Sequence, residues 1–117
     1  MYPILLFFSF LVLPGLTLDW TNDTHHDFGD IPYGKSVKYR FSFINKGEEA
    51  VVIDNVRSSC GCTLSEWPQD PILPDSTGII KVDYDAKDKG YFYKKLKVYF
   101  QGVRKAQILS IEGDIVE

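Results

Sequence analysis

The chain has 117 residues, a formal net charge of −3 and two cysteines. That length fits one domain with or without a targeting segment, and it excludes an enzyme with separate cofactor and substrate domains. A composition of 44% hydrophobic and 15% aromatic residues excludes a disordered chain. Two cysteines are too few for a disulfide framework, and the mildly acidic balance offers no general attraction to nucleic acid.

The N-terminus is sharply different from the rest of the chain. Residues 1–18 carry no charged side chain, and residues 4–13 are apolar except for Ser9. An apolar core of this length is typical of a signal peptide, whereas a membrane-spanning helix needs roughly 20 residues. We therefore expect residues 1–18 to be a signal peptide and residues 19–117 to form one exported domain. An uncleaved anchor, which would be the only membrane contact, and a buried first strand are the alternatives.

Residues 19–117 show the pattern of an all-β protein. Polar and apolar residues alternate along several short segments, which predicts half-buried strands near residues 27–31, 37–44, 50–56, 80–84, 91–100 and 109–115. Turn residues separate these segments at the spacing typical of a β-sandwich, and no helical periodicity is sustained. We expect an immunoglobulin-like β-sandwich of about seven antiparallel strands.

Basic residues are concentrated in residues 87–105, which hold seven basic side chains and one acidic one. In the strand expected there, Lys95 and Lys97 lie opposite the apolar face, whereas Lys94 falls on it. We identify a candidate interaction surface formed by Lys94, Lys95, Lys97 and Tyr99. The alternative is a solvated face whose lysines protect a sheet edge from pairing with other chains.

The segment most suggestive of chemistry is Cys60-Gly61-Cys62. The glycine lets the backbone bend tightly, so that both sulfurs could face one point. Three outcomes stay open: a disulfide, a site for copper or zinc, and two packed thiols. A structural zinc site needs four ligands, and the other soft candidates are His25 and His26, which an exposed pair explains more simply.

Other motifs give weaker signals. Asp83 and Asp85 project to one side of an expected strand, which an exposed face explains more simply than acid–base catalysis. The segment Asn22-Asp23-Thr24 is an N-glycosylation sequon. No catalytic residue is predicted, and we expect no enzymatic activity.

The order of short motifs along the chain resembles a known family. These motifs are Phe28-Gly29-Asp30-Ile31, Phe41-Ser42-Phe43-Ile44-Asn45-Lys46-Gly47, Ser59-Cys60-Gly61-Cys62-Thr63, Val82-Asp83-Tyr84-Asp85 and Ile111-Glu112-Gly113. Together they are similar to the bacterial "domain of unknown function 1573" family (DUF1573), relatives of the ASH/MSP/Hydin immunoglobulin-like domains. The resemblance covers about residues 27–116. It implies an exported sandwich that acts by binding proteins.

Two functions are therefore expected from the sequence. The first is a non-enzymatic interaction or scaffold module of the cell envelope, located in the periplasm, on the cell surface or outside the cell. Its partner would be an unidentified protein, with no nucleic acid and no cofactor. The alternative is a thiol function of Cys60 and Cys62, either copper binding or disulfide exchange.

Overall fold

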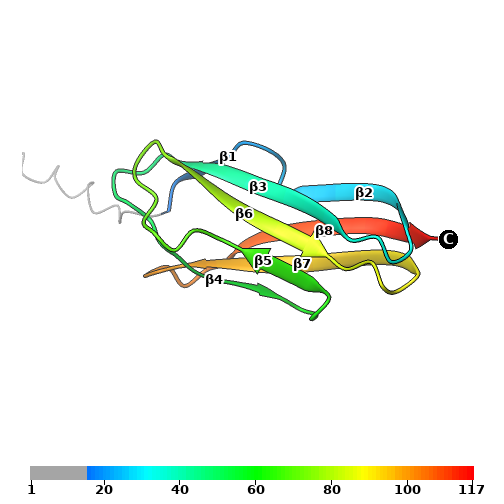
Figure 1. Cartoon of the computed structure of the whole chain (residues 1–117). Coiled ribbons are helices and arrows are strands. Elements are labelled where there is room, and N and C mark those ends of the chain that lie inside the picture. Colours follow the sequence, from blue (N-terminus) through cyan, green and yellow to red (C-terminus); the bar gives the residue numbers. More distant parts are fainter. Residues whose placement is uncertain (1–15) are drawn as a thin grey trace, which may run out of the picture.

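The computed structural model describes residues 16–117, so most of the expected signal peptide lies outside the described residues. Two four-stranded sheets pack face to face (Figure 1). In chain order the strands are β1 (Leu18–Trp20), β2 (His25–Pro32), β3 (Val37–Asn45), β4 (Ile53–Ser58), β5 (Thr63–Glu66), β6 (Thr77–Tyr84), β7 (Gly90–Phe100) and β8 (Gln107–Val116). Within residues 16–117 there is no helix that could span a membrane.

The first sheet has the order β1-β3-β6-β5, and the second has the order β2-β8-β7-β4. The expected all-β sandwich is confirmed, with eight strands rather than about seven. The strands outside the six segments named from the sequence are β1 and β5, which have only three and four residues. All pairings are antiparallel except that of β2 with β8, which is parallel. β2 and β3 are adjacent in the chain but lie in different sheets.

The core lies between the two sheets and is filled by the alternating apolar side chains that predicted the strands. Tyr84 of β6 stacks on Phe92 of β7 with ring centroids 4.0 Å apart, and Phe43 meets Phe100 edge-on at 5.7 Å. Both pairs join one sheet to the other, and all four side chains are buried. Close packing of aromatic and branched side chains thus holds the two sheets together.

The strand expected at residues 50–56 begins later, at Ile53. Before it, Val51 forms a single antiparallel bridge with Ile72. The fully buried Asn45 organises these loops: its Nδ2 atom donates to the carbonyls of Glu49 and Ile72, and its Oδ1 atom accepts from the amide of Gly47, each at 2.9 Å. An asparagine can satisfy both kinds of loop group, which explains why the loop replaces the first part of the expected strand.

The sandwich includes residues on the N-terminal side of the boundary expected after residue 18. Leu16 and Leu18 pack against the core, and the carbonyl of Thr17 accepts a hydrogen bond from the amide of Lys46 at 2.8 Å. Leu18 then pairs with Asn45 at the start of β1. The folded unit therefore uses residues 16–18 as well as the 99 residues that follow them.

Candidate interaction face on the second sheet

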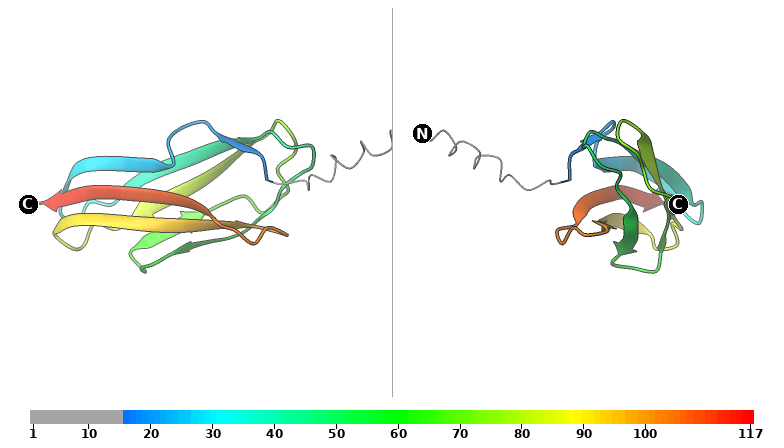
Figure 2. Two further views of the ribbon diagram at one scale, coloured as in Figure 1. Left: turned by 180° about the vertical axis from the view of Figure 1, so that it is seen from behind. Right: turned by 90° about the vertical axis from the view of Figure 1, so that its left-hand side faces the viewer.

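The second sheet turns one side away from the core, and Figure 2 (left) views the molecule from that side. We call this side the outer face. It exists because the strands alternate, so that every second residue of β7 and β8 leaves the core. Its residues are His25, Asp27, Asp30, Arg57, Tyr91, Tyr93, Lys95, Lys97, Tyr99, Ile108, Ser110, Glu112 and Asp114.

A chain of hydrogen bonds crosses the outer face from β2 to β7. The Nδ1 atom of His25 lies 2.7 Å from the hydroxyl of Ser110, and its Nε2 atom lies 2.7 Å from Oε2 of Glu112. The other carboxylate oxygen of Glu112 accepts from the hydroxyl of Tyr91 at 2.9 Å. Because a carboxylate only accepts, Nε2 of His25 carries the proton, and in the neutral ring Nδ1 accepts from Ser110.

Two exposed tyrosines of β7 contact this chain of hydrogen bonds: Tyr93 stacks on one of its members, and Tyr91 ends it. Tyr93 stacks on the His25 ring with centroids 5.4 Å apart, and 46% of Tyr93 stays exposed. Tyr91 is 65% exposed. Its hydrogen bond to Glu112 raises the pKa of Tyr91, since the bond favours the neutral phenol and the carboxylate disfavours a second negative charge. The face thus presents aromatic side chains whose positions are set by polar partners.

The structure brings three of the four predicted surface residues together. Lys95 and Lys97 are exposed on the outer face, and the half-buried Tyr99 follows them on the same side of β7. Lys94 lies on the opposite, core-directed side, as its place in the alternation predicted. Sequence reasoning missed His25, Ser110 and Glu112 as members of this face, although the alternation of polar residues in the last strand was a signal for the last two.

His25 and His26 do not form a pair. His26 lies on the other side of β2, where it stacks on Tyr39 at 3.8 Å and meets Phe28 edge-on at 4.6 Å. Burial lowers the pKa of His26, because the charged ring loses solvation there. The two histidines therefore lie in different environments, on opposite sides of β2, and do not form one set of metal ligands.

Cys60 and Cys62 are joined by a disulfide, with Cα atoms 5.3 Å apart. This bond closes the turn between β4 and β5, which belong to different sheets. The buried Thr63 places its hydroxyl 3.8 Å and 3.9 Å from the two sulfurs, whereas Gly61 is exposed. β4 and β2 lie at opposite edges of the second sheet, so the cysteines and histidines do not converge. Among residues 16–117 no three His, Cys, Asp or Glu side chains are grouped to hold a metal.

The remaining sequence candidates lie apart from the outer face. Asp83 faces outward on β6 of the first sheet, and Asp85 follows that strand, its backbone amide donating to the carbonyl of Cys62 at 3.1 Å. The sequon residue Asn22 donates from Nδ2 to the Tyr39 hydroxyl at 2.9 Å. The side-chain amide of Asn22, just after β1, thus helps to hold this segment against β3.

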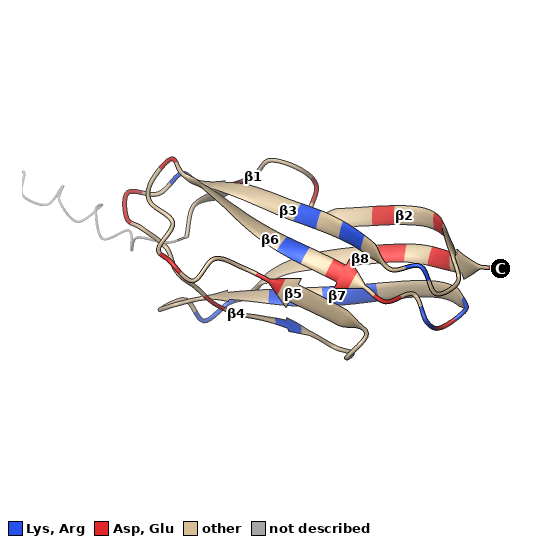
Figure 3. Ribbon diagram, in the orientation of Figure 1, with Lys and Arg blue, Asp and Glu red and all other residues tan. Residues whose placement is uncertain are grey.

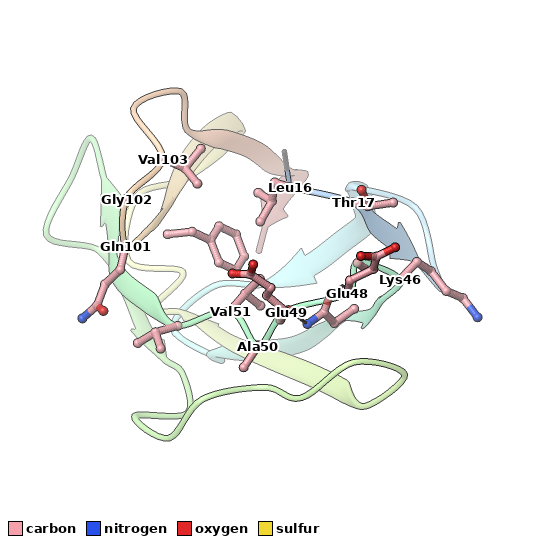
Figure 4. Close-up of a pocket in the computed structure, with 14 residues that line it drawn as sticks. Leu16, Thr17, Lys46, Glu48, Glu49, Ala50, Val51, Gln101, Gly102 and Val103 are labelled. Atoms are coloured by element: carbon pink, nitrogen blue, oxygen red, sulfur yellow. Dashed lines mark hydrogen bonds between the residues drawn. The ribbon is translucent and has the colours of Figure 1, made fainter. Parts of the chain in front are cut away.

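A shallow hollow lies at the end of the sandwich where β7 terminates (Figure 4). Apolar side chains of Leu16, Val51, Phe100 and Val103 line it together with polar loop residues of the segment 45–49. Its described lining contains no histidine, cysteine or serine. The hollow is at the opposite end of β7 from Tyr91. It is therefore not continuous with the His25–Glu112–Tyr91 hydrogen bonds of the outer face.

The two packed, mostly antiparallel sheets define an immunoglobulin-like sandwich. The chain belongs to the family described as "Protein of unknown function (DUF1573)", whose sequence model matches residues 18–115. The resemblance seen in the sequence is thereby confirmed. A comparison with curated proteins gave no match.

Solved structures share the fold at low sequence identity. The ASH/PapD-like domain 7 of human CEP192 superposes with a TM-score of 0.75 at 8% identity, covering 90% of this chain and 89% of that one. A protein of unknown function from Porphyromonas gingivalis gives 0.68 at 13%, covering 91% and 51%. The secreted serine protease VesC from Vibrio cholerae gives 0.64 at 13%. This match covers 87% of our chain but only 24% of VesC, so the likeness concerns the fold of one part of that protein.

Proposed function

We propose that this chain is a non-enzymatic protein-interaction module of the cell envelope and that it contacts its partner through the outer face. The observation that carries the proposal is the pair of exposed tyrosines over the His25–Glu112 hydrogen bond. Aromatic side chains are enriched at protein interfaces and supply most of the binding energy where they are anchored. Side chains already held in place lose little freedom when a partner binds.

Export is supported by two further features. The apolar, uncharged residues 1–18 are the expected signal peptide. The Cys60–Cys62 disulfide suits an oxidising compartment such as the periplasm or the cell exterior. The family and fold support an interaction role because a small sandwich with an open sheet face offers a binding surface.

The test compares the size of native complexes in gentle envelope extracts of the source organism. We expect the wild-type chain to elute in a complex larger than its own mass. Tyr93→Ala should shift it to smaller size, and the matched control Leu64→Ala should not, because Leu64 is 68% exposed on the first sheet. Loss of the complex in the Leu64 variant but not in the Tyr93 variant would contradict the proposal.

A second candidate function rests on the disulfide at an exposed turn. A thiolate of a partner dithiol would attack one sulfur of the Cys60–Cys62 bond, and the other sulfur would leave as a thiolate. The partner's second thiol would resolve the mixed disulfide, so that the partner is oxidised and the pair gains two electrons and two protons. On losing those two protons, the reduced pair would present two thiolates of the kind that bind Cu(I).

The double variant Cys60→Ser/Cys62→Ser separates the two functions. If the chain is an interaction module, complexes persist and the free energy of unfolding falls by about 1–2 kcal/mol, the value for a very short disulfide loop. If the chain exchanges thiols or binds copper, the variant loses dithiol oxidation or copper uptake in addition to this stability, while it still folds and its complexes persist.

A further inference from the structure

Negative charge gathers at one end of the outer face. The register of the parallel β2–β8 pair places Asp27 beside Glu112, and Asp30 beside Asp114. Asp27, Asp30 and Asp114 are exposed, and Glu112 is half-buried. Figure 3 shows these red positions of β2 and β8 toward the end where the chain terminates.

Positive charge gathers farther along the same strands. Lys97 of β7 lies between Arg57 of β4 and Ile108 of β8, and Lys95 lies beside Ser110. All three basic side chains are exposed. Because register positions run in order along the sheet, the basic rows and the acidic rows occupy opposite halves of one surface.

Aromatic and apolar side chains lie in the rows at the junction of the halves. Tyr93 pairs with Glu112, and Ile108 pairs with Lys97. Each is 46% exposed, so both side chains are available to contact a docked surface. His25 and Ser110 occupy the row between them.

Neighbouring charges do not reverse this polarity. At the acidic end, the loop residue Lys89 is engaged by Glu117, with Nζ and Oε2 2.6 Å apart. At the basic end, Asp54, Arg57 and Arg104 line a second hollow, so an added acid is matched by an added base.

We infer that the partner of the outer face is the outer face of a second copy of this chain, docked about a twofold axis. This inference rests on the proposed function and names its partner. A twofold rotation brings the acidic half of one copy onto the basic half of the other, and it does so twice in a single contact. Such complementarity favours self-recognition over a partner with one sign of charge. Tyr93 and Ile108 would lie near the centre, where burial stabilises an interface most.

The test uses sedimentation equilibrium on the chain as isolated from its source organism. A low-salt dimer that weakens as salt is added is the expected result, since salt screens the paired charges. Lys95→Glu/Lys97→Glu makes the basic half acidic although Arg57 remains, and Asp27→Lys/Asp30→Lys/Asp114→Lys makes the acidic half basic, because only Glu112 then stays negative. Each should raise the dimer dissociation constant roughly tenfold or more. An equimolar mixture of the two variants should dimerise more tightly than either variant alone, because each acidic half then meets a basic one.

The control is Lys38→Glu/Lys81→Glu, which changes charge as much as Lys95→Glu/Lys97→Glu does, but on the exposed outer side of the first sheet. This variant should dimerise like the wild type. A monomer at every concentration in low salt, a mixture that dimerises no more tightly than either variant alone, or an equal loss in the control overturns the inference. If the isolated chain is monomeric but Tyr93→Ala still disrupts complexes in envelope extracts, self-pairing fails and the proposed interaction function stands.

Discussion

The imidazole of His25 and the carboxylate of Glu112 lie 2.7 Å apart, although 87 residues separate them in the chain. Their contact fastens the edge strand β2 to β8 on the solvent side of the sheet. It also fixes Glu112 in the position from which it accepts the Tyr91 hydroxyl. One histidine–carboxylate pair thus connects the pairing of two strands to the placement of the exposed aromatic residues.

The first prediction concerns the phenol of Tyr91. Its hydrogen bond to Glu112 holds the pKa of Tyr91 above the ordinary value of 10.0. Glu112→Gln removes the negative charge, so the pKa of Tyr91 should fall toward that value. The ring carbon shifts of Tyr91, followed by NMR against pH, measure this change. Glu66→Gln, on the other sheet, is the control, and an equal fall in that variant would remove Glu112 as the cause.

The second prediction concerns His26 and the pH dependence of stability. Burial lowers the pKa of His26 below its ordinary value of 6.5, so the unfolded chain takes up this proton more readily than the folded one. The contribution of His26 to stability is therefore complete above about pH 6.5 and is lost as the pH falls toward the folded-state pKa.

His26→Phe keeps an aromatic ring against Tyr39 but does not titrate. Relative to the wild type, the variant should gain stability as the pH falls from about 7.5 to about 5. Urea unfolding of both proteins at each pH gives the difference between their free energies of unfolding. The contributions of the other titrating groups are common to both proteins and cancel in this difference. A difference that stays constant across this range would show that His26 is not the group responsible.

The third prediction concerns the buried Asn45. Asn45→Ala removes three hydrogen bonds to loop carbonyls and an amide. At about 1 kcal/mol each, the free energy of unfolding should fall by roughly 3 kcal/mol. Asn55→Ala is the matched control, because Asn55 is exposed on β4 and should change stability by less than about 0.5 kcal/mol. Similar unfolding midpoints for the two variants would contradict the role of Asn45.

The fourth prediction concerns the N-terminal edge of the fold. A chain beginning at residue 21 lacks Leu16, Leu18 and Trp20, which pack on the core, and the Thr17–Lys46 backbone hydrogen bond. Compared with a chain beginning at residue 16, its free energy of unfolding should be lower by about 3 kcal/mol or more. Thermal unfolding of the two chains measures this difference, and equal midpoints would mean that β1 adds nothing to the sandwich.

Several strands could be predicted because their side chains alternate so regularly. Phe41 and Phe43 are buried as expected, and the core-directed position of Lys94 follows from the same rule. β5 was missed because four residues between a tight turn and Trp67 are too few to show a period. β1 was missed because it begins inside the apolar N-terminal segment.

The candidate site could be predicted only in part. Lys95, Lys97 and Tyr99 were found because they are neighbours on one strand. The His25 contacts depend on the register of a parallel strand pair whose members are distant in the chain, and no local pattern specifies that register. The state of Cys60 and Cys62 also stayed open in the sequence, because their spacing alone permits a bond, a metal site or free thiols.

The most direct test of the outer face as the contact surface is site-specific photo-crosslinking in the intact envelope. A photoreactive phenylalanine analogue is placed in the position of Tyr93 in one chain and of Leu64 in another, so that each sheet carries one exposed probe. The account predicts strong crosslinks to protein from position 93 and few from position 64. Crosslinks from position 64 with none from position 93 would contradict it.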